Sequence, residues 1–242
     1  MKAMNTDSTD QPAGASSQTL DRGLRALELL AEAESPISIA QLADRLGVHR
    51  SNAYRLLRTL EARRFVLRDE AGLIRLGPRL ATLGRGAAAS LQQAVQPELV
   101  SLANTLSLTV FLTVLDADEI ITLLTAEPAH SHAAVAQRPG AVHSIDRGAP
   151  GHAIEASLTP SEHLTVFGGA ALSEPAAETR VRGYALSHDE VIEGLTSIAV
   201  PLRLSGEPPA SLAIVSIGLP DDAEGVARQL SEAASRIERN AR

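Results

Sequence analysis

The stretch from Ser38 to Gly77 constrains the fold of this 242-residue chain more than any other segment. Its central part predicts a helix with one buried face, because apolar residues recur at i, i+3, i+4 and i+7, namely Ala53, Leu56, Leu57 and Leu60. At about 100° per residue, the outer side then carries Ser51, Arg55 and Arg58, flanked by Asn52, Tyr54 and Thr59. That side offers hydrogen-bond donors and no acid before Glu61.

A shorter helix precedes this one, with Ser38 as its N-cap and Gly47 at its end, since glycine tolerates a left-handed turn. Two short helices joined so tightly form a helix-turn-helix, whose second helix enters a DNA major groove. Residues 65–68 and 73–76 are strand-like runs around the turn sequence Asp69-Glu70-Ala71-Gly72. They predict a hairpin, the wing of a winged helix.

Only the N-terminal part of the chain carries a net positive charge. Residues 20–85 carry a net charge of +4, whereas residues 86–242 carry −10 and the whole chain −7. A chain that is acidic overall does not attract a phosphate backbone as a whole, but a basic face on one module can. Because six arginines stand against one glutamate within residues 45–64, we expect this face to bind DNA rather than to be only a solvated surface.

The N-terminal region resembles that of IclR-type bacterial transcriptional regulators (isocitrate lyase regulator family) in the segments LDRGLRALELL, SIAQLADRLGVHRSNAYRLLRTLEARRFV and GLIRLGPRLATLG. The resemblance continues through GAVHSIDRGAPGHAIEA and RVRGYALSHDEVIEGLTSIAVPL and covers nearly all of the chain after residue 18. One departure is Arg63-Arg64, where the family usually has a glycine that ends the recognition helix. A residue there must adopt a left-handed conformation, or the chain must use another turn.

We expect four segments. Residues 1–18 are a polar tail without the apolar region of a signal peptide, and we expect it to be disordered. Residues 19–77 form the winged helix-turn-helix and begin with a helix whose inner face carries Leu24, Leu27, Leu30 and Ala31. Residues 78–96 form a helix that starts at Pro78; the resemblance implies a linker that also dimerises the DNA-binding domains. Residues 97–242 form the last domain.

Apolar runs in the last domain predict strands at residues 109–115, 120–125, 141–145, 196–204 and 210–217. A helix is expected from His152, and another near the C-terminus with Val226, Leu230, Ala233 and Ile237 inward. Mixed strands with helices to one side indicate an α+β fold, so the whole chain is a winged helix followed by an α+β domain. The resemblance implies that this domain is GAF-like and binds an effector.

The loop from Gly148 to His152 is the candidate ligand site of the last domain. A glycine-containing loop that opens a helix presents backbone N–H groups, which can bind a carboxylate. From the loop alone, an ordinary helix start is the simpler interpretation. The resemblance implies that the loop and the facing strands enclose a small organic-acid effector. Its polar contacts fall on Ala149, Pro150, Ser187, Ser197 and a residue of the last strand within 215–217, for which we take Ser216. The resemblance places the apolar wall at His132, Val135, His143 and Leu195.

Three histidines depart from the family pattern. His132 and His143 stand at usually apolar positions, and His152 stands in place of the usual lysine. We therefore expect an anionic or hydrogen-bonding effector, aromatic or dicarboxylic, that imidazoles contact. Zinc is a second interpretation, with His130, His132, His143, His152 and Asp146 as ligands. The chain has no cysteine and no helical H-x-x-x-H spacing, so we expect neither metal nor cofactor.

The sequence is thus interpreted as that of a cytoplasmic, effector-responsive transcriptional regulator that acts as a homodimer or a dimer of dimers on a palindromic operator. Contacts with bases or adjacent phosphates are expected from Arg50, Ser51, Asn52, Tyr54 and Arg55, and contacts with phosphates from Arg58, Arg68 and Arg75. No apolar run reaches the roughly 18 residues of a membrane span. Two other classes stay open: a winged helix that binds a protein, and an enzyme with an appended helix-turn-helix. Enzyme motifs such as a nucleophile elbow or a P-loop are absent from the sequence.

Overall fold

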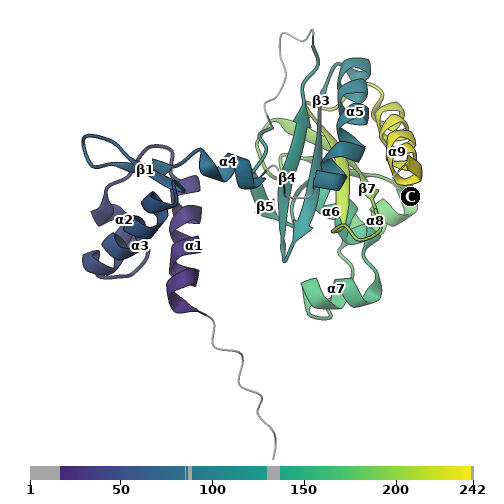
Figure 1. Ribbon diagram of the computed structural model, residues 1–242. Helices are drawn as coiled ribbons and strands as arrows, with labels where there is room; N and C mark the ends of the chain where they lie inside the picture. The colour runs from purple at the N-terminus through teal and green to yellow at the C-terminus, as the bar shows by residue number, and fades with distance from the viewer. Residues whose placement is uncertain (1–16, 85, 87–88, 130–136, 241–242) are drawn as a thin grey trace, which may run out of the picture. The chain divides into compact units, whose positions relative to one another are not determined.

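Figure 1 shows the computed structural model, which describes residues 17–84, 86, 89–129 and 137–240. The chain divides into two compact units, Met1–Ala87 and Ala88–Arg242. Each unit has a hydrophobic core of its own. Most of the expected polar tail, residues 1–16, lies outside the described residues. Within the described ranges, no helix combines the length and the apolar character that crossing a membrane requires.

The first unit is the predicted winged helix-turn-helix. Its elements are α1 (Gln18–Ala31), α2 (Ile39–Arg45), α3 (Arg50–Ala62), β1 (Val66–Arg68), β2 (Ile74–Leu76) and α4 (Arg79–Gly84). A capping box joins Ser38 to Gln41 at the start of α2, and Gly47 has the expected left-handed φ of 63°. Strands β1 and β2 pair antiparallel, with Leu67 opposite Arg75. The wing is therefore confirmed.

The core of this unit confirms the predicted inner face of α3 and half of that of α1, where Leu30 is buried and Leu27 packs against the core. Ala53, Leu56 and Leu57 are buried. In α1, Ala26 and Leu30 are buried, whereas Leu24 is 52% exposed and Ala31 is exposed as well. The prediction is wrong for Leu24 and Ala31, because leucines lie on several sides of α1 and their spacing does not single out the face that packs on α3 and β2.

The end of α3 is a Schellman motif with an arginine in the glycine position. The N–H of Arg64 donates to the carbonyl of Glu61 at 2.9 Å, and the N–H of Phe65 donates to the carbonyl of Leu60 at 2.9 Å. These are the two hydrogen bonds that define the motif, and they require a left-handed conformation at Arg64. Arg64 has a φ of 61°. Of the two alternatives left by the sequence, the chain therefore adopts the left-handed one.

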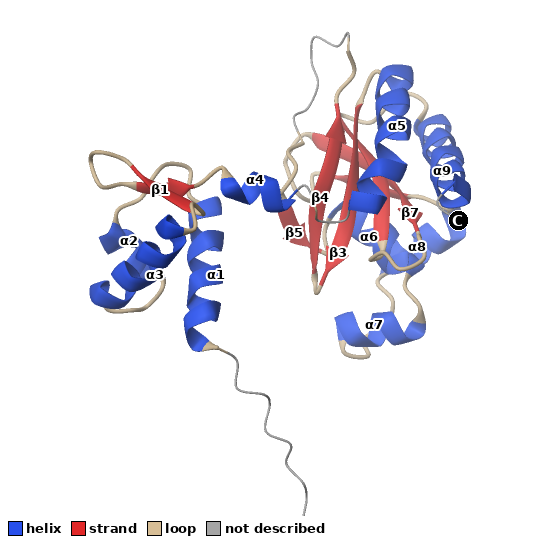
Figure 2. Ribbon diagram, viewed as in Figure 1, coloured by secondary structure: helices blue, strands red, loops and turns tan. Residues whose placement is uncertain are grey.

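The second unit contains a six-stranded sheet with helices on both faces (Figure 2). Its elements are α5 (Ala89–Leu106), β3 (Thr109–Asp116), β4 (Glu119–Ala126), β5 (Val142–Ser144), α6 (Gly148–Ser157), α7 (Pro160–Phe167), α8 (Glu174–Arg182), β6 (Ala185–His188), β7 (Leu195–Leu202), β8 (Ala210–Ile217) and α9 (Ala223–Asn240). The strand order is β5-β4-β3-β8-β7-β6, and every neighbouring pair is antiparallel. The α+β class is confirmed.

Successive side chains along each strand point to opposite faces of the sheet, so that two hydrophobic layers form. On one face, α5 and α9 cover a large core that includes Leu112, Ile198 and Ile214. On the other, α6 covers Phe111, Ala213 and Val215. The expectation that helices lie to one side of the sheet is therefore wrong, because the strands are apolar on both faces and each face needs a cover.

Three local boundaries also differ from the prediction. The expected single helix over residues 78–96 is replaced by α4 and α5, and α5 continues through Pro97. Helix α6 begins at Gly148, four residues before the expected start, so the candidate loop is itself the first helical turn. Strand β6 was missed because four residues give too few alternations for a pattern.

A bidentate pair between Arg236 and Glu98 links α9 to α5 and raises the pKa of Arg236.

Candidate functional site

The outward face of α3 is a polar and basic surface. The residues expected to contact DNA from this helix are all exposed: Arg50, Ser51, Asn52, Tyr54, Arg55 and Arg58. Among the described residues, none of these arginines forms an ion pair. Since their guanidinium groups are uncompensated and point away from the core, they can neutralise phosphates or donate to base edges.

The first turn of α3 is fixed by His49, a residue that the sequence did not single out. His49 is the N-cap, and its Nδ1 accepts a hydrogen bond from the N–H of Ser51 at 3.4 Å. The same nitrogen lies 3.0 Å from the hydroxyl of Ser51. The Ser51 side chain is therefore held in one orientation before it meets any ligand.

Arg68, at the base of the wing, differs from the other arginines of this surface. Its Nε donates to the carboxylate of Glu61 at 2.8 Å, and its guanidinium lies 5.8 Å from the centre of the Tyr54 ring. Arg68 thus pairs with Glu61 of α3 and links the wing to that helix, in addition to the contact with a phosphate that is expected of it. Arg75, on the opposite strand, is exposed and forms no ion pair within the described part of the chain.

A groove of about 470 Å³ borders the same surface, between α1 and α3. Its floor includes Leu27, Leu56 and Leu60, and its rim includes Asn52 and Arg55. Leu20 and Leu24 contribute exposed apolar surface from α1. Two of the α3 side chains expected to contact DNA, Asn52 and Arg55, therefore stand beside an apolar groove.

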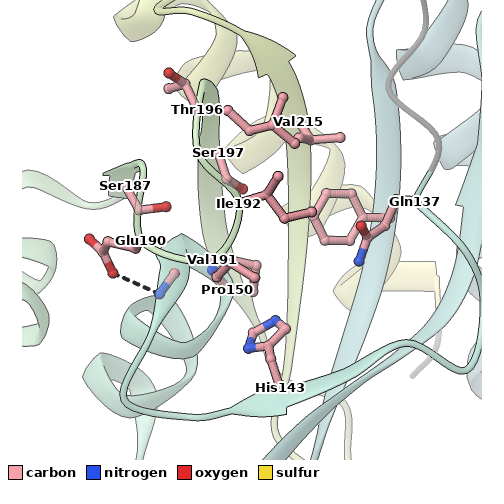
Figure 3. Close-up of a pocket in the computed structure, with 13 residues that line it drawn as sticks. Gln137, His143, Pro150, Ser187, Glu190, Val191, Ile192, Thr196, Ser197 and Val215 are labelled. Carbon is pink, nitrogen blue, oxygen red and sulfur yellow. Dashed lines mark hydrogen bonds between the residues drawn. The ribbon is translucent and has the colours of Figure 1, made fainter. Parts of the chain in front are cut away.

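The second unit contains a partly open cavity of about 60 Å³ between the sheet, the start of α6 and the β6–β7 loop (Figure 3). Its apolar wall comes from Phe111, Pro150, Val191, Ile192, Leu195 and Val215. Its polar groups come from Gln137, His143, Gly148, Ser187, Glu190, Thr196 and Ser197. Glu190 is the one carboxylate among the described residues of this lining. The cavity therefore combines an apolar body with a few converging polar groups, as small-molecule sites do.

The structure brings together five of the nine residues expected in an effector site. His143, Pro150, Ser187, Leu195 and Ser197 line the cavity. Ala149 is buried just behind it, and its N–H donates to the hydroxyl of Ser187 at 2.8 Å. His132 and Val135 lie outside the described residues.

Ser216 does not reach the cavity and is a correction to the expected set. It alternates with Val215 along β8, so its side chain shares the face of Ile214, on the side of α5 and α9. Its hydroxyl donates to the carbonyl of Gly218 at 2.9 Å. Val215 takes its place in the cavity wall, because a shift of one residue along a strand exchanges the two faces.

A carboxylate already occupies the start of α6. The N–H of Gly148 donates to Oε2 of Glu190 at 2.7 Å, and Nε2 of His152 lies 2.8 Å from the same oxygen. Gly148 has a φ of 84°, and a β-carbon there would lie 2.9 Å from a methyl group of Val191. Glycine is therefore needed at this position both for the backbone conformation and for the approach of the β6–β7 loop.

Other cavity residues are held by hydrogen bonds to the protein. Ser197 donates to the carbonyl of Ile214 at 2.7 Å, and the amide of Gln137 donates to the hydroxyl of Thr122 at 2.9 Å. His143 Nδ1 lies 3.0 Å from the carbonyl of Ser144. Because a carbonyl only accepts, Nδ1 carries the proton, and Nε2 of a neutral His143 is left as an acceptor.

Sequence reasoning missed Glu190, Val191 and Ile192, which reach the cavity from the β6–β7 loop. Phe111 and Val215 were missed as well, although the two-residue alternation of their strands would have placed them on the α6 face. No group of three or more potential metal ligands converges within the described residues. Two of the histidines considered for zinc, His130 and His132, lie outside those residues.

Comparisons with known proteins match both units. The IclR helix-turn-helix domain matches residues 19–70, and the family described as bacterial transcriptional regulator IclR C-terminal matches residues 87–239. The transcriptional repressor IclR of Escherichia coli is 28% identical over 206 residues, which are 78% of this chain and 75% of that protein.

Solved structures are similar over nearly the whole chain. An IclR transcriptional regulator from Alicyclobacillus acidocaldarius has a TM-score of 0.81 at 25% identity and covers 93% of this chain and 99% of its own. An IclR homologue from Microbacterium hydrocarbonoxydans, solved in complex with 4-hydroxybenzoate, has a TM-score of 0.77 at 25% identity, with 92% and 98% of the two chains covered.

Proposed function

The chain belongs to the IclR family of bacterial transcriptional regulators, and on that premise we propose that α3 and the wing bind an operator whose affinity depends on an acid in the cavity of the second unit. The observation that carries the DNA-binding part is the exposed face of α3. It presents Arg50, Arg55 and Arg58 without an ion-pair partner among the described residues, together with the donors of Ser51, Asn52 and Tyr54.

Specific roles follow from position on α3 and on the wing. Arg50, Ser51, Asn52, Tyr54 and Arg55 contact bases or adjacent phosphates, whereas Arg58 and Arg75 neutralise phosphates. Arg68 acts mainly by holding the wing, because Glu61 already compensates its charge. A homodimer that presents two such faces binds a palindromic site, since the symmetry of an operator mirrors that of its protein.

The cavity is the proposed binding site of a small organic or aromatic acid. Support comes from its apolar wall with converging polar groups and from the related Microbacterium protein, which was solved with an aromatic acid bound. An effector changes operator affinity only by the difference in its own affinity for the two states of the protein. A cytoplasmic regulator without catalytic activity fits these properties.

The test is a pull-down of genomic DNA fragments with the purified full-length chain at two salt concentrations. We expect one palindromic site to be enriched at low salt and to be lost steeply at high salt, because about five neutralised phosphates give a log-log slope of roughly −4.5. Enrichment of no sequence at either salt would contradict operator binding and would favour the alternative that the winged helix binds a protein.

A further inference from the structure

The hydrogen-bond donors at the start of α6 are all engaged by the protein itself. Gly148 donates to Glu190, Ala149 donates to Ser187, and Pro150 has no N–H to offer. His152 also directs its Nε2 at Glu190. A ligand carboxylate that enters the cavity therefore finds its natural binding position filled by the carboxylate of Glu190, which would in addition repel it.

The two partners in this contact differ sharply in burial. His152 is 3% exposed, and the Glu190 side chain is 35% exposed. Because a carboxylate only accepts, Nε2 of His152 must carry the proton, and its Nδ1 has no partner among the described residues. Glu190 is therefore the one acceptor that His152 has in this part of the structure, whereas water can solvate Glu190 once it leaves.

This difference in burial determines which chemical group can replace the carboxylate of Glu190. Withdrawal of Glu190 leaves the N–H groups of Gly148 and His152 buried without an acceptor, a state that is strongly unfavourable. A second carboxylate restores both hydrogen bonds, and an amide restores them less well because charge-assisted bonds are the stronger ones. The position therefore exchanges one carboxylate for another.

The size of the cavity agrees with an occupied site. Its volume of about 60 Å³ holds a few water molecules and lies below the roughly 300 to 1,000 Å³ of typical ligand sites. Glu190, Val191 and Ile192 lie in the same loop and line the same wall. Val191 and Ile192 are 46% and 55% exposed, so displacement of this loop enlarges the cavity without uncovering a core.

We propose that Glu190 is an internal competitor for the effector, and that the effector is a carboxylate with an apolar body whose carboxylate replaces that of Glu190 on Gly148 and His152. This inference rests on the proposed function of the cavity. The apolar body lies against Phe111, Leu195 and Val215, and the displaced Glu190 takes the β6–β7 loop outward into solvent.

The test compares benzoate with its neutral isostere benzamide, by calorimetry on the full-length protein. In Glu190→Ala, benzoate affinity should rise about tenfold over the wild type, because no fraction of the sites is blocked by the internal carboxylate. Benzamide affinity should change little. Glu193→Ala is the matched control, since it removes an exposed carboxylate from the same loop outside the cavity lining and should leave benzoate affinity unchanged.

A second variant tests the same proposal in case Glu190→Ala does not fold. Glu190→Gln keeps the size and an acceptor oxygen while removing the charge, and it should raise benzoate affinity by a smaller factor. The proposal is overturned if neither variant binds benzoate more tightly than the wild type, or if benzamide gains as much as benzoate. DNA enrichment without ligand is measured on the same preparations, so failure of operator binding is distinguished from failure of the carboxylate exchange.

Discussion

The backbone oxygen of Arg64 occupies the place that a β-carbon on Gly77 would need. The two residues close the wing from either end, because the N–H of Gly77 donates to the carbonyl of Phe65 at 2.7 Å. Glycine at position 77 is thus required by a close approach of two backbones.

Gly77→Ala should destabilise the first unit by about 1 to 3 kcal/mol, since an added methyl group in a tight contact forces the backbone apart. Thermal unfolding followed by circular dichroism measures the change. Gly23→Ala is the control: it lies in α1, where an added methyl group would have nothing within 4 Å, and it should be neutral or stabilising. Equal effects of both substitutions would contradict the close approach.

Arg64→Gly should stabilise the first unit by about 0.5 to 1 kcal/mol, because the left-handed conformation at the end of α3 is unfavourable for a non-glycine residue. Arg64→Ala removes the charge but keeps a β-carbon on a residue with left-handed backbone, so it should give no gain in stability. Urea denaturation of the three proteins separates the backbone effect from the electrostatic one. A gain in the alanine variant would assign the effect to charge.

Arg55→Ala should weaken binding to the enriched DNA site by about 1 to 3 kcal/mol if Arg55 contacts a base. Arg68→Ala should lower affinity less and should leave the salt slope nearly unchanged, because Glu61 accepts from its Nε at 2.8 Å. Fluorescence anisotropy over a salt series measures both quantities. A larger loss for Arg68→Ala would show that the internal ion pair opens on DNA.

Thr113 and Ser211 form a buried hydroxyl pair, 2.8 Å apart, between β3 and β8. Thr113→Val should cost about 1 to 3 kcal/mol, because it leaves the Ser211 hydroxyl buried without a partner. The double variant Thr113→Val/Ser211→Ala should cost less than the sum of the two single changes. A double-mutant cycle by urea unfolding tests the coupling, and strict additivity would exclude it.

Glu162 makes the acid stability of the second unit predictable. Arg203 and the start of α7 at Thr159 lower the pKa of Glu162 from 4.5 to about 2. An acid whose pKa falls on folding stabilises the protein above its unfolded pKa and loses that effect as the pH falls through its folded pKa. Glu162 should therefore contribute its full stabilisation above pH 4.5 and lose it progressively towards pH 2.

Glu162→Gln should flatten the stability profile over that interval. The loss at neutral pH should be below about 1 kcal/mol, because the pair with Arg203 is partly exposed and screened by solvent. Urea midpoints from strongly acidic to neutral pH give the profile, and Glu178→Gln, an exposed change on α8, is the control. An unchanged acid slope in Glu162→Gln would assign the acid sensitivity to other groups.

Local signals made the first unit predictable. The inner face of α3, the cap at Ser38 and the turn at Gly47 each depend on residues a few positions apart, so periodicity and capping rules suffice. The inner face of α1 was predicted only in part: Leu27 and Leu30 face the core as expected, but the packing on α3 and β2 buries Ala26 in place of Leu24 and Ala31.

The cavity depends on contacts between distant segments, and there the sequence is less informative. Glu190 meets Gly148 across 42 residues, and no pattern in the β6–β7 loop indicates that its carboxylate turns inward. Ser216 was misplaced by one position because strand faces alternate and the register of β8 is set by its neighbours. Five of the residues that the family resemblance indicated nonetheless line this cavity, and their role in binding an effector stays a prediction.

If Glu190 competes with the effector, its contact with Gly148 and His152 affects how tightly the effector binds but not which effector fits. In the proposed exchange, the cavity walls determine which acid fits, whereas the carboxylate of Glu190 determines the concentration at which that acid binds. An exposed loop residue can change in a single mutational step without rebuilding the interior. If Glu190 competes with the effector as proposed, a substitution at this one position changes the response threshold while the effector stays the same.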